Sequence, residues 1–425
     1  MIDVIPIITA MCLGLISGII TGLAPGIPII MGYLLFLPFV EVSPAPLLVY
    51  AVVSNLGSQY FGSQAALYYR IPGESSSYPV LIEAPNFDTP AKIYQAVQVT
   101  TWGSFFASVA AGGFLWMTMT LGWLSDLRLP LPIKSLLFLI LIGIAVFANG
   151  RWLVNLLALV AFSVLAFWED LASMTQGVLP VYYFNGMLAL IIVFATQAIW
   201  HPSMSANVSD RIDKVPMRFR PWAKTYAGST ALGMILGLIP QLGATISSYA
   251  AYLWCKYRKQ DPMTRVAAAE TANNSGIIMM WMPLLLFGVP ISATEIFFLQ
   301  YFAQKGLDLT VLREQASINW MLFAILASSA VYLALALATN RVLYRVIADW
   351  LKSKWFVASL AVFSLLMFYY INNYTASYVL VHVLVFVPVS WLISRLAVDM
   401  LTAVLGLLLM GEILSTWYRV YQIYF

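Results

Sequence analysis

Apolar segments long enough to cross a bilayer recur along the whole chain, and no other feature limits the fold as strongly. A spanning helix needs about 20 predominantly apolar residues, and windows of that kind leave no room for a large soluble domain. Of the 425 residues, 61% are hydrophobic and 9% are charged, whereas soluble domains carry about 25% charged residues. Backbone polar groups in lipid must be satisfied within the segment. We therefore predict an all-α polytopic membrane protein with about 12 membrane elements.

Several of these segments are interrupted by proline and glycine. The stretch 55–77, NLGSQYFGSQAALYYRIPGESSS, begins as an apolar segment and ends at Pro72-Gly73 and three serines, with Arg70 and Glu74 beside the interruption. Irregular backbone and charged side chains at membrane depth are tolerated where they line a polar cavity or are buried in protein. We expect discontinuous helices around such a cavity.

Basic loops predict which segments turn back inside the membrane. Cytoplasmic loops carry an excess of Lys and Arg, and the segment 226–255 lies between two basic loops, 211–224 and 256–265. A segment that begins and ends on the same side of the membrane must turn back as a re-entrant hairpin of two half-helices, and Gly237-Leu-Ile-Pro240 supplies the turn. Residues 5–40 contain a similar interruption at Gly22-Leu-Ala-Pro25, but their flanks are acidic, so this hairpin is expected to enter from the opposite side.

The interruptions form an internal repeat. The residue numbers of the two Gly-Leu-x-Pro runs differ by 215. Those of Asn55 and Asn273 differ by 218, as do those of Pro72 and Pro290. Inverted repeats with broken helices are typical of secondary transporters, whose site lies where the repeats meet. Within one membrane domain we predict a first inverted repeat at 1–125 and linking scaffold helices at 126–225. The core of the second inverted repeat follows at 226–310, and C-terminal helices at 311–425.

These runs resemble the large membrane subunit of the tripartite tricarboxylate transporters, the TctA family. The matching runs are Gly22-Leu-Ala-Pro25-Gly26, Gly62-Ser63, Ile71-Pro72-Gly73-Glu74-Ser75-Ser76, Gly237-Leu-Ile-Pro240-Gln-Leu-Gly243-Ala244-Thr245, Glu270-Thr-Ala-Asn273-Asn274 and Leu286-Phe-Gly288-Val-Pro290. The resemblance implies a carboxylate symporter of the bacterial inner membrane, driven by Na⁺ or H⁺. It also implies a small membrane subunit and a periplasmic solute-binding protein as partners. Where the family pattern has Pro-Gly, this chain has Pro240-Gln241 and Pro290-Ile291.

The candidate substrate site follows from the interruptions and the matching runs. Freed backbone groups, hydroxyls and amides at half-helix ends suit a carboxylate and a cation. The predicted substrate-binding residues are Pro25, Gly26, Asn55, Gly62, Ser63, Arg70, Pro72, Gly73, Ser75, Ser76, Pro240, Gly243, Thr245, Asn273, Asn274, Pro290, Ser292 and Thr294. The predicted ion-coupling residues are Glu270, Asn273 and Glu74, with Na⁺ near Asn55 and Asn273 as the one cofactor considered.

Each charged candidate also has a simpler interpretation. Arg70 either pairs with a substrate carboxylate or extends to the cytoplasmic interface. Glu270 either carries the coupling cation or favours a helix start through the macrodipole, and the same choice applies to Glu74.

The uncharged candidates leave a similar choice. Asn55, Asn273 and Asn274 either contact the cation or the carboxylate, or form hydrogen bonds that hold helices together. The serines and Thr294 cap half-helices or contact substrate.

Other functions agree less well with the sequence. A channel also uses broken helices, but its filter usually repeats around an oligomer axis. An intramembrane enzyme is disfavoured because the chain has no His-Glu-x-x-His or Gly-x-Ser-x-Gly run, and an ATP-driven pump because it has no phosphate-binding loop. The net charge of +4 is spread over loops and indicates no nucleic-acid partner. The scaffold helices leave room for a homodimer.

Overall fold

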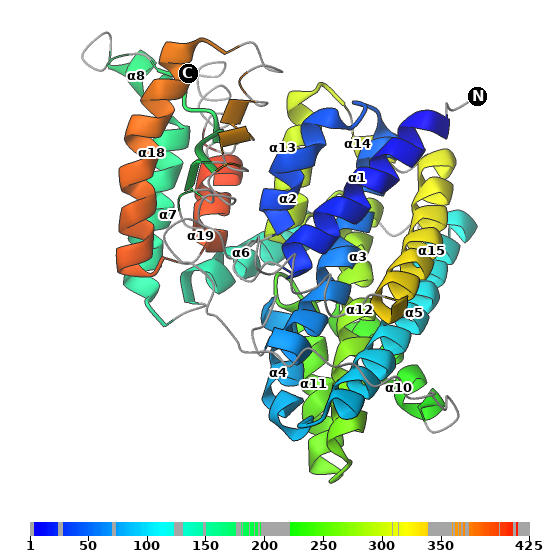
Figure 1. The fold of residues 1–425 in the computed structure, drawn as a ribbon. Helices are drawn as coiled ribbons and strands as arrows, with labels where there is room; N and C mark the ends of the chain where they lie inside the picture. The colour runs from blue at the N-terminus through cyan, green and yellow to red at the C-terminus, as the bar shows by residue number, and fades with distance from the viewer. Residues whose placement is uncertain are drawn as a thin grey trace. The chain divides into compact units, whose positions relative to one another are not determined.

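The computed structural model is built of helices and contains no strand among the residues that it describes (Figure 1). Those residues are 4–23, 29–69, 74–122, 131–147, 150–175, 222–307, 309–312, 314–338, 374–398 and 400–410, with single residues and short stretches between 180 and 196 and between 359 and 369, and residue 414. Within this part of the chain, α1, α5, α15 and α18 are long and apolar enough to cross a membrane, and the bent pair α7–α8 adds a fifth candidate. The predicted all-α polytopic class is confirmed.

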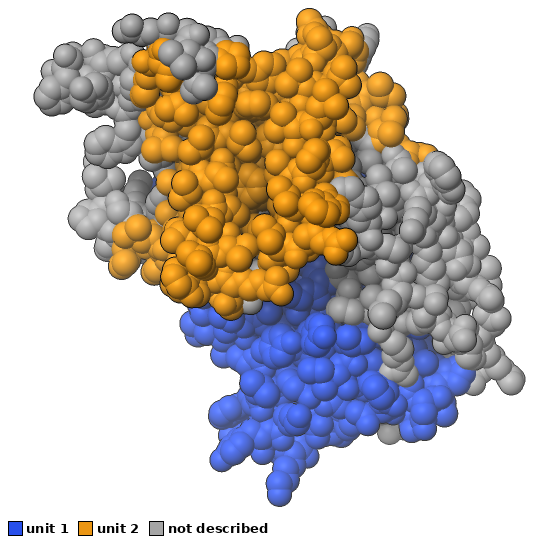
Figure 2. All heavy atoms as spheres, turned by 90° about the vertical axis from the view of Figure 1, so that its left-hand side faces the viewer, with its two compact units in different colours: residues 1–128, 202–289, 307–356 blue, residues 129–201, 290–306, 357–425 orange. Residues whose placement is uncertain are grey.

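The chain forms two compact units, coloured separately in Figure 2. Unit 1 comprises residues 1–128, 202–289 and 307–356, and unit 2 comprises residues 129–201, 290–306 and 357–425. The helices of unit 1 are α1 (Val4–Leu23), α2 (Ile29–Phe36), α3 (Pro44–Tyr69), α4 (Tyr78–Glu83), α5 (Pro90–Leu121), α10 (Ala223–Leu236), α11 (Gly243–Tyr257), α12 (Pro262–Phe287), α14 (Leu309–Leu312) and α15 (Gln315–Ala338). Those of unit 2 are α6 (Leu131–Phe147), α7 (Trp152–Ala166), α8 (Trp168–Met174), α13 (Ala293–Gln304), α18 (Ala376–Leu396) and α19 (Met400–Val404). The four segments predicted from the sequence stay a prediction.

Two helices, α3 and α12, form the centre of unit 1. Side chains from Val266 to Leu285 of α12 are buried on every face, and those from Leu47 to Tyr68 of α3 are buried as well. A helix buried all round lies inside a bundle. Neither helix is among the apolar spans named above, because each carries polar residues in its middle.

Local sequence fixes the bounds of α12. The Asp261 side chain accepts a hydrogen bond of 3.1 Å from the Thr264 amide at the start of the helix, and Pro262 occupies the first turn. At the other end Gly288 adopts a φ of 67°, the left-handed conformation in which glycine ends a helix without steric cost. The chain therefore leaves the helix just before Pro290.

All four predicted interruptions separate helices. The chain breaks between α1 and α2, after α3, between α10 and α11, and between α12 and α13. At the third break, the turn 237–242 joins α10 to α11, and the amide of Leu242 donates to the carbonyl of Pro240 at 2.6 Å. Within unit 1, Figure 1 shows α1 and α2 above α10 and α11. The first and third breaks therefore produce two helical hairpins in different parts of the unit.

The internal repeat extends to helix bounds and to packing. Helices α3 and α12 each have 26 residues, and their first residues, like their last, differ in number by 218. A Cβ at Gly18 of α1 would lie 2.7 Å from the carbonyl of Ser54 and 2.8 Å from Cα of Gly57. A Cβ at Gly233 of α10 would overlap the carbonyl of Ala272 and the hydroxyl of Ser275. At the same offset, Ala272 and Ser275 are the equivalents of Ser54 and Gly57.

The next glycine along each first helix shows the same correspondence. A Cβ at Gly22 would lie 2.7 Å from the carbonyl of Ser58, and one at Gly237 would lie 2.5 Å from the carbonyl of Gly276. Ser58 and Gly276 are again equivalent at this offset. The hairpins α1–α2 and α10–α11 thus pack against their long helices through equivalent residues.

Candidate functional site

A fully buried carboxylate, Glu270, lies at the junction of α3, α5 and α12. Its Oε1 accepts hydrogen bonds from Nδ2 of Asn274 at 2.8 Å and from the hydroxyl of Ser104 in α5 at 3.4 Å. Asn274 also donates to that hydroxyl at 2.8 Å. Ser63 of α3 and Asn273 lie beside the same carboxylate. The structure therefore brings together four predicted site residues, Ser63, Glu270, Asn273 and Asn274.

Several polar atoms of this cluster have no hydrogen-bond partner among the described residues. They are Oε2 of Glu270, Oδ1 and Nδ2 of Asn273, and Oδ1 of Asn274, and all are buried. A buried polar atom without a partner usually costs about 1–3 kcal/mol. Three of the four atoms are oxygens, which are the ligands that a hard cation prefers.

No positive side chain balances Glu270 within the described part of the chain. The ion pairs recorded there are Lys92–Asp88 and Arg265–Glu83, and neither includes it. An isolated carboxylate charge in such surroundings is too costly to persist unless it is neutralised. The carboxyl group must therefore bind either a proton or a metal cation. The described residues hold no group of three or more His, Cys, Asp or Glu side chains, so a cation here would rely on amide and hydroxyl oxygens.

The α5 side of the cluster was missed from the sequence. Thr100, Ser104 and Ser108 are buried and follow one another at intervals of four residues, which places them on one face of α5. That periodicity within an apolar helix was a usable signal. Tyr60 of α3 lies near Ser108 and near Ser329 of α15, so the polar groups around the carboxylate come from four helices.

A second polar cluster joins the two repeat copies. After the break that follows α3, the 3₁₀ turn η2 (Ser75–Ser77) contacts α11, which follows the break of the second hairpin. The hydroxyls of Ser75 and Thr245 are 3.0 Å apart, and the hydroxyl of Ser248 donates to the carbonyl of Ser76 at 2.7 Å. Ser75 is exposed and Thr245 is half-buried. The side chains of Ser75 and Thr245 are therefore at least partly accessible, whereas Ser248 is buried.

Glu74 holds this turn on α3. Its two carboxylate oxygens accept hydrogen bonds from Ser58 and from the amide of Gln59, and Oε1 of Gln59 accepts from the hydroxyl of Ser76 at 2.9 Å. Glu74 is the N-cap residue of η2 but makes no side-chain cap hydrogen bond to it, so both interpretations of Glu74 stay predictions. Both oxygens of Glu74 accept hydrogen bonds, whereas Oε2 of Glu270 has no partner among the described residues.

Several other predicted residues have packing contacts. A Cβ at Gly243 would overlap the carbonyl of Gly237, and the backbone nitrogen of Gly62 lies 3.1 Å from a Cβ built at Gly22. Pro240 lies in the hairpin turn. No recorded hydrogen bond joins Asn55, which is 7% exposed on α3, to the described residues of the Glu270 cluster. Substrate contact by these residues stays a prediction, as does Na⁺ near Asn55.

The remaining predicted residues lie in unit 2 or outside the described chain. Pro290, Ser292 and Thr294 belong to unit 2, where the hydroxyl of Ser292 accepts from the Glu295 amide at 3.3 Å and caps α13. Glu295 accepts in turn from the amide of Ile291 at 2.6 Å. Ser292 therefore caps α13, and substrate contact by Pro290, Ser292 and Thr294 stays a prediction. Pro25, Gly26, Arg70, Pro72 and Gly73 lie outside the described residues.

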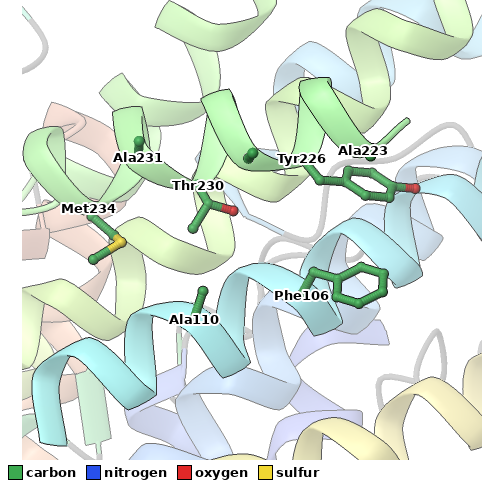
Figure 3. Close-up of a pocket in the computed structure, with 8 residues that line it drawn as sticks. Phe106, Ala110, Ala223, Tyr226, Thr230, Ala231 and Met234 are labelled. Atoms are coloured by element: carbon green, nitrogen blue, oxygen red, sulfur yellow. The ribbon is translucent and has the colours of Figure 1, made fainter. Parts of the chain in front are cut away.

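A cavity of about 510 Å³ between α5 and α10 is an unsuitable carboxylate site (Figure 3). Its walls carry Phe106 and Ala110 from α5 and Tyr226, Ala231 and Met234 from α10. The hydroxyl of Tyr226 already donates to the carbonyl of Val99 at 2.8 Å. None of the described residues that line the cavity is charged, and apart from Tyr226 only Thr230 carries a hydroxyl, so they offer little that binds an anion.

Comparison with known proteins gave a family match and a relative. The model of the tripartite tricarboxylate transporter TctA family matches residues 8–405. A protein of Agrobacterium vitis, described as an uncharacterized 52.8 kDa protein in the TAR-I ttuC′ 3′ region, is 25% identical over 348 residues, which cover 73% of this chain and 67% of that protein. No solved structure matches the chain.

Proposed function

Because the chain belongs to the tripartite tricarboxylate transporter TctA family, we propose that this membrane component moves a small carboxylate by symport with a cation bound at Glu270. The observation that carries the proposal is the buried Glu270 carboxylate, which has no positive partner among the described residues. An ionisable side chain inside the membrane is by default a candidate for an ion pathway, and cation binding at Glu270 would neutralise the charge that it buries.

The residues of the Glu270 cluster could bind either Na⁺ or a proton. Oε2 of Glu270 and the free oxygens of Asn273 and Asn274 would hold Na⁺. For a proton, Oε2 would become a donor and the free amide oxygens would be its acceptors. In both cases the neutralised carboxyl removes the cost of a buried charge. The bound cation would supply that neutralisation, and so favour the loaded state.

The carboxylate substrate would bind where the two repeat copies touch. Ser75 and Thr245 offer hydroxyl donors there. The first amide groups of α11 also point out of its N-terminal end, and no side chain of its N-cap residue bonds to them. Since this contact joins a segment of the first copy to one of the second, a change in their relative position would open or close the site.

The family supports a proposal about the partner subunits and the location of the protein. We propose that a small membrane subunit and a periplasmic solute-binding protein complete the system in a bacterial inner membrane. A homodimer remains part of the proposal.

The test is thermal unfolding of the purified protein with dicarboxylates and tricarboxylates, in Na⁺ or K⁺ and at two pH values. A ligand that binds only the native state raises the melting temperature. We expect one carboxylate class to do so, with a shift that depends on Na⁺ or on pH. In Glu270→Gln the carboxylate shift should lose that dependence. A shift that ignores both cations in the wild type would contradict the proposal.

A further inference from the structure

A groove of about 640 Å³ lies between α10 and α11, the two arms of the second hairpin. Each helix contributes one face, because its lining residues recur at intervals of about four. They include Lys224, Gly228 and Leu232 on α10 and Ala251, Trp254 and Arg258 on or just after α11. The groove therefore follows the hairpin from its open base towards its turn.

The far part of the groove is apolar. Leu232 packs against a buried cluster of Ala251, Cys255, Ala268 and Ala272. At Gly228 an added Cβ would meet no atom within 4 Å, so the wall is open at this position. A hydrocarbon chain is the kind of group that such a surface accommodates.

The base of the groove is basic. Lys224 and Arg258 line it, and neither takes part in the ion pairs recorded for the described residues. The Arg258 guanidinium lies 4.6 Å from the ring centroid of Trp254. Trp254 and Tyr257 are 57% and 84% exposed, as expected for aromatic residues at a membrane interface.

We propose that this groove binds an anionic phospholipid, with the phosphate at Lys224 and Arg258 and an acyl chain along the apolar part. A cationic end followed by a hydrocarbon surface matches an amphiphile, and not a small carboxylate. The basic loops on both sides predict that the base lies at the cytoplasmic face, where anionic headgroups gather. The cavity of Figure 3 lies on another side of α10, and the described residues that line it include no cation.

The charge test measures lipid binding to the detergent-purified protein by native mass spectrometry. Phosphatidylglycerol and phosphatidylcholine with identical acyl chains are compared. The double variant Lys224→Gln/Arg258→Gln should weaken phosphatidylglycerol binding by about 25-fold, roughly fivefold for each charge, and leave phosphatidylcholine unchanged. Lys92→Gln is the control, because Lys92 is exposed and paired with Asp88 at 2.9 Å.

A second variant tests the groove itself. Gly228→Leu fills the open wall and should abolish the preference for phosphatidylglycerol. Ala227→Leu is the matched control, because Ala227 is the adjacent residue and lines the cavity of Figure 3 instead. Equal binding of both lipids by the wild type, or an unchanged double variant, would overturn the proposal. Complete displacement of the lipid by an equal concentration of inorganic phosphate would also overturn it, since the site would then belong to a free anion.

Discussion

Helices α3 and α12 have the same length and the same glycine-packed contacts, but they differ in the charge that they bury. Position 270 of α12 is glutamate and position 274 is asparagine, whereas the equivalent positions of α3 are Val52 and Leu56. Asn55 and Asn273 are the same residue in both copies. The packing frame is thus duplicated, whereas the buried carboxylate that we propose as the cation site is not. The repeat symmetry alone would therefore wrongly predict a second buried carboxylate in α3.

The segments after the two long helices differ as well. After α3, Glu74 turns back to Ser58 and Gln59 of the helix that precedes it. The equivalents of Ser58 and Gln59 in α12 are Gly276 and Ile277, which offer no side-chain donor. The chain after α12 is instead fixed by the Ser292 cap. Each break therefore has its own means of support, and only the break itself recurs.

The largest expected effect comes from removing the charge of the buried carboxylate that only α12 carries among the two helices. Truncating one partner of a buried, hydrogen-bonded charge pair weakens binding by about 2–5 kcal/mol, and about 1.4 kcal/mol is a factor of ten. Glu270→Gln should therefore reduce coupled carboxylate uptake by about 100-fold or more, measured with the partner subunits present. Its melting temperature should be unchanged or higher, because a buried charge is removed.

The same variant has a matched control in the first copy. In Glu74→Gln the uptake should fall far less, because Ser58 and Gln59 already engage this carboxylate and its role is to hold η2. Half of the wild-type uptake in Glu270→Gln, or equal losses in the two variants, would contradict the assignment of the cation to α12.

The next effect tests the shared packing frame. In Gly233→Ala the new methyl group would overlap the backbone carbonyl of Ala272, and overpacking typically costs about 1–3 kcal/mol. We expect a lower free energy of unfolding, measured by denaturant titration in detergent. Gly18→Ala should cost less, because its nearest backbone oxygen is 2.7 Å from the Cβ. Gly228→Ala is the control: it meets no atom within 4 Å and should be neutral or stabilising. Equal behaviour of Gly228→Ala and Gly233→Ala would refute the packing argument.

The sequence predicted the frame better than it predicted the site. Pro and Gly act locally on backbone conformation, so the four breaks and their near-constant offset are visible in the chain. The Glu270 cluster also needs Ser104 and Ser108 of α5, which are far away in sequence and become partners only through packing. Their four-residue spacing showed which face of α5 is buried, but not which helix that face meets.

An ion pair between the two copies, whose cation has no equivalent in the first copy, should have an intermediate effect. Arg265, at the start of α12, donates to Oε1 of Glu83 in α4 at 2.8 Å, and Tyr252 of α11 donates to the same oxygen at 3.0 Å. The equivalent of Arg265 in α3 is Leu47. Arg265→Met leaves the buried Glu83 charge without its cation and should lower the free energy of unfolding by about 2 kcal/mol. Adding Glu83→Gln should restore part of that loss. If the double variant were no more stable than Arg265→Met alone, the two side chains would not be energetically coupled.

The smallest expected effect concerns the turn of the second hairpin. Gln241 follows Pro240 and adopts a φ of 58°, a left-handed conformation that costs a non-glycine residue about 1 kcal/mol or more. The residue after Pro25 in the first copy is Gly26, and glycine reaches this conformation without steric cost. Gln241→Gly makes the two turns alike in sequence and should raise the free energy of unfolding by up to about 1 kcal/mol, since the added freedom of the unfolded chain offsets part of the gain. Gln241→Ala is the control, because it removes the same side chain but keeps the Cβ that causes the strain. If both variants changed stability equally, the effect would come from the glutamine side chain and not from the backbone conformation of the turn.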